Sequence, residues 1–254
     1  MMRLVAHQTR YDLLTFARNR QARFLTVFLP VIFLVIFVGV FGNTLTGPDH
    51  IKASTYYVPG IAALAVLSAS FSNLVIAVTT QRELGVLKRR RATPAPAGVI
   101  IAGRALTSLV ISLTVTGVVI AIGSIGYGVH VAPGALGTLA LSVTLGSLTL
   151  ATLGFAVSPA VGPADAAQPA VLALTLPLSF ISGVYIPSVQ LPSALRHIAQ
   201  AFPLQHLVAA LGRGFLPGTH GIAWGDLAIL AAWGAAGLIA AVSRFRWTPA
   251  AARA

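Results

Sequence analysis

Side chains that could carry out catalysis are few in this sequence, and they lie outside its long apolar segments. Of 254 residues only 9% are charged, and the chain has six histidines and no cysteine. Thiolate chemistry, disulfides and Cys-ligated metal sites are thereby excluded. Proton and ion carriers usually keep Asp, Glu or His within the membrane as relays, whereas Asp165 and Asp226 only approach the ends of apolar segments. Coordination of an ion by hydroxyls and backbone carbonyls stays open. The histidines are His7, His50, His130, His197, His206 and His220.

The sequence motifs of nucleotide-binding and hydrolytic sites are absent from this chain. No G-x-x-x-x-G-K-[ST] stretch occurs, and neither of the two lysines, Lys52 and Lys88, follows a glycine. H-E-x-x-H and G-x-S-x-G are also absent. We therefore expect no enzymatic activity and no cofactor on this chain, and we expect the energy for any work to come from another subunit.

A charged segment follows the second apolar run and reads Q-R-E-L-G-V-L-K-R-R-R-A-T-P over residues 81–94. We expect a short helix over residues 81–91 that stops near Thr93, because a residue before proline disfavours helical geometry. The segment could be an orienting loop that contacts anionic lipid headgroups. It could also be a docking helix for a cytoplasmic partner. Glu83 favours docking, because an orientation signal needs no acid.

Neutral polar residues gather in the second and fifth apolar runs. Asn73 is the most polar residue deep within any run. Such groups usually form hydrogen bonds between helices, and the alternative is that some of them line a translocation path. The residues are Ser68, Ser70, Ser72, Asn73 and Thr79 in the second run, and Thr175, Ser179 and Ser182 with Pro169 and Pro177 in the fifth.

The elements that must position these residues are membrane-spanning helices. About 20 apolar residues cross the hydrocarbon core as a helix, and 56% of this chain is hydrophobic. The predicted fold is therefore an all-α integral membrane protein with six spans in one domain. The first span is too long for a signal peptide, and no small-x-small cleavage site follows it. The predicted spans are residues 24–42, 57–80, 100–126, 134–157, 166–185 and 224–242.

The basic surplus orients these spans. The formal net charge is +12, which in a soluble protein would raise the question of nucleic-acid binding. Here fourteen Lys and Arg residues fall on the side of the N-terminus and three, Lys52, Arg196 and Arg213, fall on the other. Cytoplasmic loops carry the excess of Lys and Arg. We expect a multi-pass plasma-membrane protein with both termini in the cytoplasm and no nucleic-acid partner.

Two flanking regions are expected to be helical without crossing the membrane. Residues 1–23 place Val5, Leu13 and Phe16 on one helical face and three arginines on another, which indicates an interfacial helix. Simple orientation charge is the alternative. Residues 186–223 are moderately apolar but interrupted by Pro187, Pro192 and Pro203 and by Arg196, His197 and Arg213. Proline and charge disfavour a straight span, so we expect a re-entrant or interfacial helical pair on the outer side, or an ordinary extracellular loop.

Three stretches together resemble the permease subunit of type-two ATP-binding-cassette exporters, a group that includes the daunorubicin/doxorubicin-resistance permeases. The likeness follows the chain in order and spacing over nearly its whole length. One departure is that His206 stands where the family often has Tyr, and Arg213 comes one position late. The stretches are Arg18-Asn19-Arg20 before Pro30; R-E-L-G-V-L-K-R-R-R-A-T-P over residues 82–94, followed by Gly103; and S-G-V-Y-I-P-x-x-x-L-P over residues 182–192, continuing to Pro203-Leu204.

The resemblance implies partners and site residues. It implies a dimer of permeases, with the second chain identical or paralogous, and two cytoplasmic ATPase subunits that bind ATP and Mg. It also implies a coupling loop at residues 81–97, received by a groove in the ATPase, a substrate path between spans two and five, and an outer re-entrant motif. The coupling residues are Arg82, Glu83, Leu84, Gly85, Leu87, Lys88 and Arg89. The path residues are Ser72, Asn73, Thr175, Ser179 and Phe180, and the re-entrant motif contains Ser182, Gly183, Pro187, Pro192 and Pro203.

The expected function is that of an exporter permease embedded in membrane lipids. Because the path residues offer hydroxyls and aromatic rings but no charge, the expected substrate is a hydrophobic or amphipathic small molecule such as a drug, an antibiotic or a lipid-like product. The alternatives are a sodium or other ion exporter of the same architecture, an intramembrane enzyme, and a membrane scaffold that transports nothing.

Overall fold

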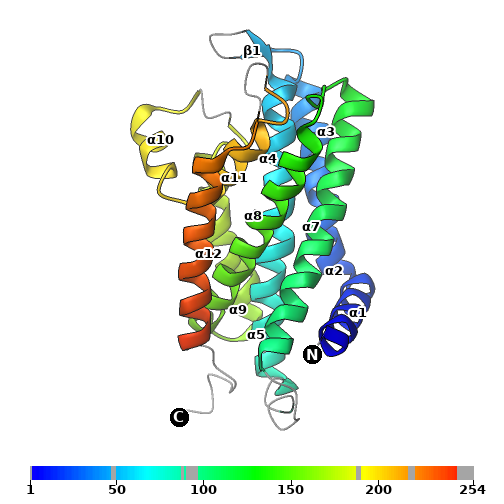
Figure 1. The fold of residues 1–254 in the computed structure, drawn as a ribbon, viewed down its shortest axis with the longest axis vertical. Helices are drawn as coiled ribbons and strands as arrows, with labels where there is room; N and C mark the ends of the chain where they lie inside the picture. Colours follow the sequence, from blue (N-terminus) through cyan, green and yellow to red (C-terminus); the bar gives the residue numbers. More distant parts are fainter. Residues whose placement is uncertain are drawn as a thin grey trace.

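A computed structural model describes residues 2–46, 50–86, 89, 97–186, 190–216 and 221–244. Its helices run side by side as an elongated bundle (Figure 1). We call the end that carries α1 (Met2–Arg18) the lower end, as Figure 1 draws it, and the opposite end the upper end. Six helices are long and apolar enough to cross a membrane, which confirms the prediction of a mostly helical membrane protein. They are Arg20–Phe41, Ala53–Glu83, Gly98–Tyr127, Ala135–Ala160, Ala164–Ile181 and Trp224–Ser243.

Span one begins where the chain breaks out of α1 at Asn19. Asn19 has an extended backbone, and its side-chain oxygen accepts a hydrogen bond of 3.0 Å from the Ala22 N–H. This is a helix N-cap, which satisfies one of the free N–H groups of the first turn. The span continues through α2 (Arg20–Arg23), the π-helical segment η1 (Phe24–Phe28) and α3 (Leu29–Phe41). It leads into a two-residue antiparallel pair, β1 (Leu45–Thr46) and β2 (Ile51–Lys52), which are the only strands within the described residues.

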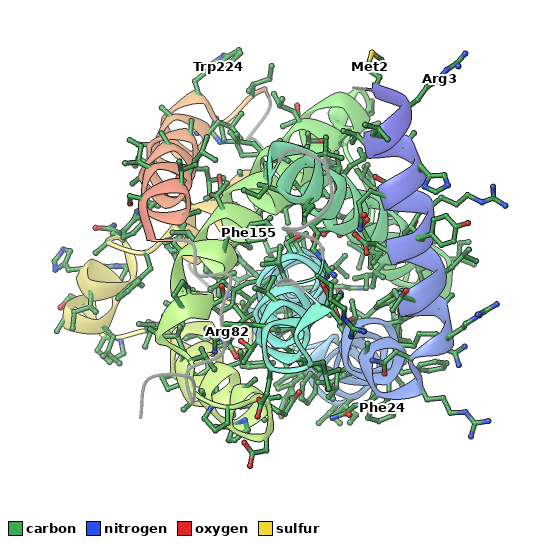
Figure 2. The ribbon with its side chains drawn as sticks, turned by 90° about the horizontal axis from the view of Figure 1, so that it is seen from below. Met2, Arg3, Phe24, Arg82, Phe155 and Trp224 are labelled. Carbon is green, nitrogen blue, oxygen red and sulfur yellow. The ribbon has the colours of Figure 1, made fainter. Side chains whose placement is uncertain are left out.

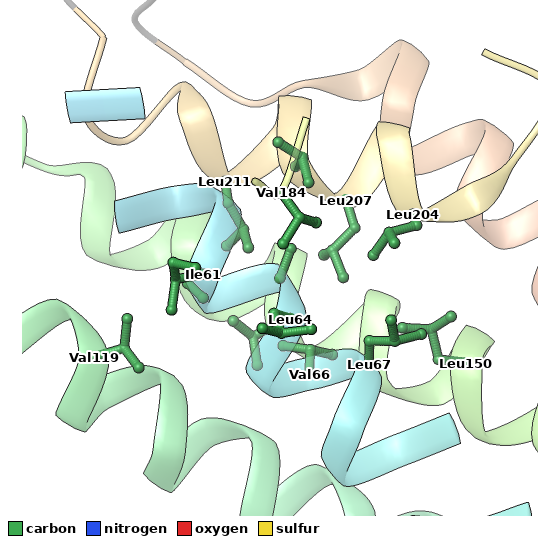
Figure 3. Packing of buried hydrophobic residues seen from close by; sticks show 14 of the residues in the cluster. Ile61, Leu64, Val66, Leu67, Val119, Leu150, Val184, Leu204, Leu207 and Leu211 are labelled. Atoms are coloured by element: carbon green, nitrogen blue, oxygen red, sulfur yellow. The ribbon is translucent and has the colours of Figure 1, made fainter. Parts of the chain in front are cut away.

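Span two is the central helix of the bundle. It consists of α4 (Ala53–Leu67), the π-helical segment η2 (Ser68–Ser72) and α5 (Asn73–Glu83). Figure 3 shows its Ile61, Leu64 and Leu67 side chains among residues of other helices. Burial of such side chains removes apolar area from water or lipid and fixes the packing of the surrounding helices. The partners in this core are Val119, Leu150, Val184, Leu204, Leu207 and Leu211.

The other long helices pack around span two or against its neighbours. They are α7 (Ala97–Tyr127), α8 (Ala135–Val157) with the 3₁₀ turn η3 (Ser158–Ala160), α9 (Ala164–Ile181) and α12 (Trp224–Arg244). Two short helices, α10 (Ser193–Ala199) and α11 (Pro203–Gly212), lie at the upper end between α9 and α12. α12 packs against α8 and α11. A buried hydroxyl junction joins three helices, because Ser70 Oγ lies 2.9 Å from Ser112 Oγ and 2.8 Å from Ser147 Oγ. The interhelical role expected for such residues therefore holds for Ser70.

Several helix boundaries differ from the predicted ones. Span two begins at Ala53 rather than at residue 57, and α7 begins at Ala97 rather than at residue 100. The helix of span five ends at Ile181 rather than at residue 185, because Gly183 turns the chain with φ +83°. The helix expected over residues 81–91 does not begin there, because α5 runs on to Glu83 and Gly85 then adopts φ +67°. Residues 87–88 and 90–91 lie outside the described residues.

The N-terminal helix α1 docks on the lower part of α7. Thr9 Oγ1 donates a hydrogen bond of 3.2 Å to the carbonyl of Gly103, and Arg104 lies 3.6 Å from the Asp12 carboxylate. A Cβ at Gly103 would meet the Gln8 side chain at 2.6 Å. Both Asp12 and Arg104 are largely buried, so this side of α1 is a protein contact. The arginines of α1 lie on its exposed side, as Figure 2 shows for Arg3.

We expect Asp12→Asn to loosen α1 from α7. The change removes the charged partner of a largely buried Arg104, and removing one partner of a buried ion pair costs about 3–5 kcal/mol. The thermal unfolding temperature of the detergent-purified protein should fall, and α1 should become more sensitive to protease. Exchanging the two charges in Asp12→Arg with Arg104→Asp should restore part of the loss. An Asp12→Asn protein with unchanged stability and protease resistance would show that the pair does not hold α1.

Candidate functional site

A cavity of about 520 Å³ lies between spans one, two and five, toward the lower end of the bundle. Its walls come from the end of α1, α2, η1 and α3 on one side, from α4, η2 and α5 on a second side, and from α9 on a third. Its neutral polar lining residues are Thr15, Asn19, Gln21, Thr26, Ser68, Ser72, Asn73, Thr80, Gln81, Gln168, Thr175, Ser179 and Tyr185. Its apolar lining residues are Ala22, Leu25, Leu29, Phe33, Leu64, Leu67, Ile76, Ala77, Leu84, Val171, Leu172 and Leu176.

Two π-helical segments, η1 and η2, border this cavity. Leu25 and Thr26 of η1 and Ser68 and Ser72 of η2 are lining residues. A π-helical turn inserts one residue into the α-helical repeat, and such turns are frequent at functional sites. The insertion changes which side chains face the cavity above and below it. Spans one and two therefore depart from regular α-helix where they border the cavity.

The side chains of span two offer hydrogen bonds to a ligand. Ser72 and Asn73 lie at the junction of η2 and α5, and neither makes a side-chain hydrogen bond within the described part of the chain. Gln81 Oε1 is buried at the lower part of the cavity, also with no partner among the described residues. An unpaired polar group costs free energy when it is shielded from water. These groups therefore favour occupation of the cavity by water or by a molecule with polar groups.

The hydroxyls of span five act differently. Thr175 Oγ1 donates a hydrogen bond of 2.8 Å to the Val171 carbonyl, and Ser179 Oγ donates one of 2.7 Å to the Thr175 carbonyl. Each hydroxyl proton is thereby used within α9, and the oxygen keeps acceptor capacity toward the cavity. Thr175 and Ser179 therefore offer acceptors to the cavity, whereas the amide of Asn73 on span two can both donate and accept.

An aromatic cluster closes the upper part of the cavity. Tyr185 and Phe33 line the cavity, and their ring centroids lie 5.3 Å apart. The ring of Tyr185 also lies 5.7 Å from that of Phe37 and 5.0 Å from that of Phe180. Tyr185 lies beyond the end of α9, outside the six spans, and burial raises the pKa of its phenol to about 12. The phenol is therefore uncharged at physiological pH.

The cavity has no charged lining residue among the residues that the structure describes. Its side chains are apolar groups, hydroxyls and amides. Within the described ranges there is also no group of three or more His, Asp or Glu side chains that could hold a metal ion. Ionic substrates lose their hydration free energy in such a site without gaining a counter-charge. The arrangement therefore suits a neutral amphipathic molecule.

The structure brings together four of the five residues predicted to line the path. Ser72, Asn73, Thr175 and Ser179 all face the one cavity. Phe180 is not a lining residue and is about half exposed, but its ring packs against Tyr185. The sequence reasoning missed several lining residues, including Tyr185, Gln168 and Thr80. Helical spacing could have found two of them, because Gln168 lies seven residues before Thr175, and Thr80 lies seven residues after Asn73, each on the same helical face.

The residues assigned to coupling fall into two groups. Arg82 and Glu83 form the last turn of α5, and Arg82 is only 4% exposed. Its guanidinium donates hydrogen bonds to backbone carbonyls between α8 and α9, and the Glu83 carboxylate accepts one from the Ala164 N–H. These two side chains therefore contact their own chain. Leu84 and Gly85 form the following turn, the exposed Arg89 bonds back to the Leu84 carbonyl, and Leu87 and Lys88 lie outside the described residues.

The outer motif begins with a turn that packs against span two. Ser182, Gly183 and Val184 are buried, and the Gly183 and Val184 carbonyls approach Gly60 of α4. Pro187 lies outside the described residues. Pro192 precedes α10, and Pro203 opens α11, where its missing N–H costs nothing. Two helices are thus present in this region, and their depth in a bilayer stays a prediction.

His206 fixes α11 to α12 at the upper end. Its Nδ1 lies 2.8 Å from the Asp226 carboxylate and its Nε2 lies 2.9 Å from the Gln200 carbonyl. Both neighbours are hydrogen-bond acceptors, and a ring nitrogen that carries a proton can donate to either of them. The histidine that departs from the resembled family therefore has a structural partner in span six.

We expect His206→Leu to destabilise the upper end. The change removes the ring nitrogens that face the Asp226 carboxylate and the Gln200 carbonyl, and a hydrogen bond to a charged group contributes about 1.5–3 kcal/mol. Limited proteolysis between α10 and α11 should accelerate, and the thermal unfolding temperature should fall. The matched control is His197→Leu, which removes an exposed imidazole from α10. Equal behaviour of the two variants would contradict the role of His206.

The comparison with protein families shows what this chain is similar to. Residues 4–216, more than half of the chain, match a family model described as ABC-2 type transporter. The matched range contains α1 from its third residue onward, spans one to five, the cavity and the two upper helices. No curated protein gives a match to the chain.

Proposed function

The chain belongs to the ABC-2 type transporter family, and on this premise we propose that it exports a hydrophobic or amphipathic small molecule. Family membership and the six apolar helices make it a multi-pass membrane permease component of an ABC transporter. The family also implies association with an ATPase subunit. A drug, an antibiotic or a lipid-like product fits the proposed substrate class.

The observation that supports this substrate class is the uncharged cavity. Apolar side chains from spans one, two and five surround it, and Ser72, Asn73, Thr175 and Ser179 add neutral polar groups. Apolar burial supplies binding free energy, and a few polar groups fix orientation, as in most small-molecule sites. A sodium exporter of the same architecture is favoured less, because no carboxylate of the described residues lines the cavity.

The remaining parts of the proposal concern assembly and orientation. Two ATPase subunits, which carry ATP and Mg, bind the lower end around residues 81–97. A second permease chain, identical or paralogous, completes the transporter. The lower end faces the cytoplasm, because it carries α1 with its exposed arginines and the basic segment after α5. Outward passage then runs from the cavity past the aromatic cluster of Phe33, Phe37, Phe180 and Tyr185.

A test of the substrate class uses two dyes and the purified complex of this chain with its ATPase subunit. Nile red, a neutral lipophilic dye, should stimulate ATP hydrolysis and should bind with a saturable fluorescence change. Carboxyfluorescein, which is anionic, should do neither. Stimulation by carboxyfluorescein or by Na⁺, without an effect of Nile red, would contradict a neutral amphipathic substrate.

A further inference from the structure

Two adjacent residues at the end of α5 contact the connection between α8 and α9. Arg82 Nη1 donates a hydrogen bond of 3.1 Å to the Ser158 carbonyl, and its Nη2 donates to the Val161 and Gly162 carbonyls at 2.7 and 2.9 Å. Glu83 accepts from the backbone N–H of Ala164, the first residue of α9. Figure 2 shows Arg82 inside the outline of the bundle, in contrast to Arg3.

The charges of these two residues match the helix ends that they meet. Ser158 is the C-cap of α8, where backbone carbonyls lack partners and the helix dipole is negative. Ala164 begins α9, where free N–H groups and the positive end of the dipole favour an anion. Hydrogen bonds with a charged partner are stronger than neutral ones. The buried position of Arg82 also protects its bonds from screening by salt.

The opposite wall of the cavity is bonded differently. α5 and α9 pack against each other along the cavity. By contrast, Thr9 and Asp12 of α1 bond to α7, and the Asn19 side chain bonds to Ala22 within the start of span one. Span one and span two meet mainly in their upper halves, through α3 and α4. In the lower part of the cavity, the walls formed by α5 and α9 are therefore joined to each other, and the wall formed by span one is separate from them.

We propose that α5 and α9 move as one body, which we call the α5–α9 pair, and that the lower entrance of the cavity opens between this pair and span one. This inference rests on the proposed function. A push by the ATPase on the segment after Glu83 reaches α9 as well as α5, because Arg82 and Glu83 bond to both ends of the α8–α9 connection. Asn73 on α5 then keeps its position relative to Thr175 and Ser179 on α9. Arg82 is a positioning residue that acts through the connection.

The natural chain has no cysteine, so pairs of spin labels can be placed without background. Three alanines are suitable: Ala77 on α5, Ala170 on α9 and Ala22 on α2. The labelled chain is diluted with unlabelled chain, assembled with its ATPase in lipid, and measured without nucleotide and after trapping with ADP and vanadate. The Ala77→Cys/Ala170→Cys distance should be the same in both states, and the Ala77→Cys/Ala22→Cys distance should change. A change in the first distance as large as that in the second, or no change in the second, overturns the proposal.

Arg82→Ala tests the bond that joins the pair. In this variant the Ala77→Cys/Ala170→Cys distance distribution should broaden, and Arg82→Lys should restore it in part. Substrate moved per ATP hydrolysed should fall roughly tenfold, the factor given by loss of one charge-assisted hydrogen bond. The control Arg20→Ala removes an exposed arginine at the same end and should leave distances and ratio unchanged. If Arg82 is needed only for folding, Arg82→Ala will lower the protein yield but change neither the distance distribution nor the amount of substrate moved per ATP hydrolysed. That result overturns the proposal. If the wild-type complex moves no substrate at all, the proposed function fails, while the distances still test the pair.

Discussion

Replacing Asn73 by tryptophan is expected to reduce substrate transport roughly tenfold or more, the size of effect that follows when about 1.4 kcal/mol of favourable interaction is lost. Asn73 lines the cavity from the start of α5, as Thr175 and Ser179 do from α9. An indole at this position occupies space that the substrate needs and removes an amide that can both donate and accept. The measurement is ATP-dependent dye uptake by inside-out proteoliposomes.

The control for Asn73→Trp is Thr114→Trp. Thr114 is exposed on α7, and its hydroxyl bonds only to its own helix. The same enlargement there adds an aromatic ring to the outer surface of the bundle and leaves the cavity as it was. Thr114→Trp should transport like the unmodified protein. If Asn73→Trp transports equally well at equal protein yield, the cavity is not the substrate path.

Replacing Gly60 by leucine is expected to prevent the upper part of the bundle from assembling. A Cβ at Gly60 would lie 2.7 Å from the Val184 carbonyl oxygen and 3.0 Å from that of Gly183. Both atoms belong to backbone, so the turn after α9 must move away from α4. Overpacking of this kind usually costs about 1–3 kcal/mol even for smaller insertions. The yield of monodisperse protein should fall sharply, and Gly60→Ala should already lower the thermal unfolding temperature.

The control for Gly60→Ala is Gly117→Ala, which is expected to change stability in the opposite direction. Gly117 lies within α7, and a Cβ there would meet nothing within 4 Å. Gly117→Ala should therefore raise stability by up to about 1 kcal/mol, since alanine is the better helix former. If Gly60→Ala and Gly117→Ala change the unfolding temperature in the same direction, the close approach of Val184 to α4 does not govern this packing.

The apolar segments could be read from the sequence because lipid imposes a simple rule on them. Every backbone polar group must be satisfied within the span, so long apolar runs become helices. The ends of the helices follow local chemistry that is less regular. Asn19 ends α1 by capping α2, and Gly183 ends the region of span five by a left-handed turn. The amino-acid composition predicts neither the π-helical segments nor the cavity that they border.

The site could be predicted in part for the same physical reasons. Polar side chains within an apolar run are costly unless they are paired or face a cavity, and this drew attention to Ser72, Asn73, Thr175 and Ser179. The role of Arg82 and Glu83 could not be predicted, because their partners are backbone groups at residues 158–164 that only the fold brings close. An arginine beside a glutamate in a basic segment reads as a surface motif until the α8–α9 connection is placed against it.

The most direct test of a permease driven by a separate ATPase is uptake measured with and without that subunit. The purified chain is reconstituted into liposomes alone, with its ATPase subunit, and with an ATPase variant that cannot hydrolyse ATP. Nile red accumulation against its gradient is followed after ATP addition. Accumulation is expected only in the second sample. Uphill movement by the chain alone, or with the inactive ATPase, would contradict the proposed mechanism.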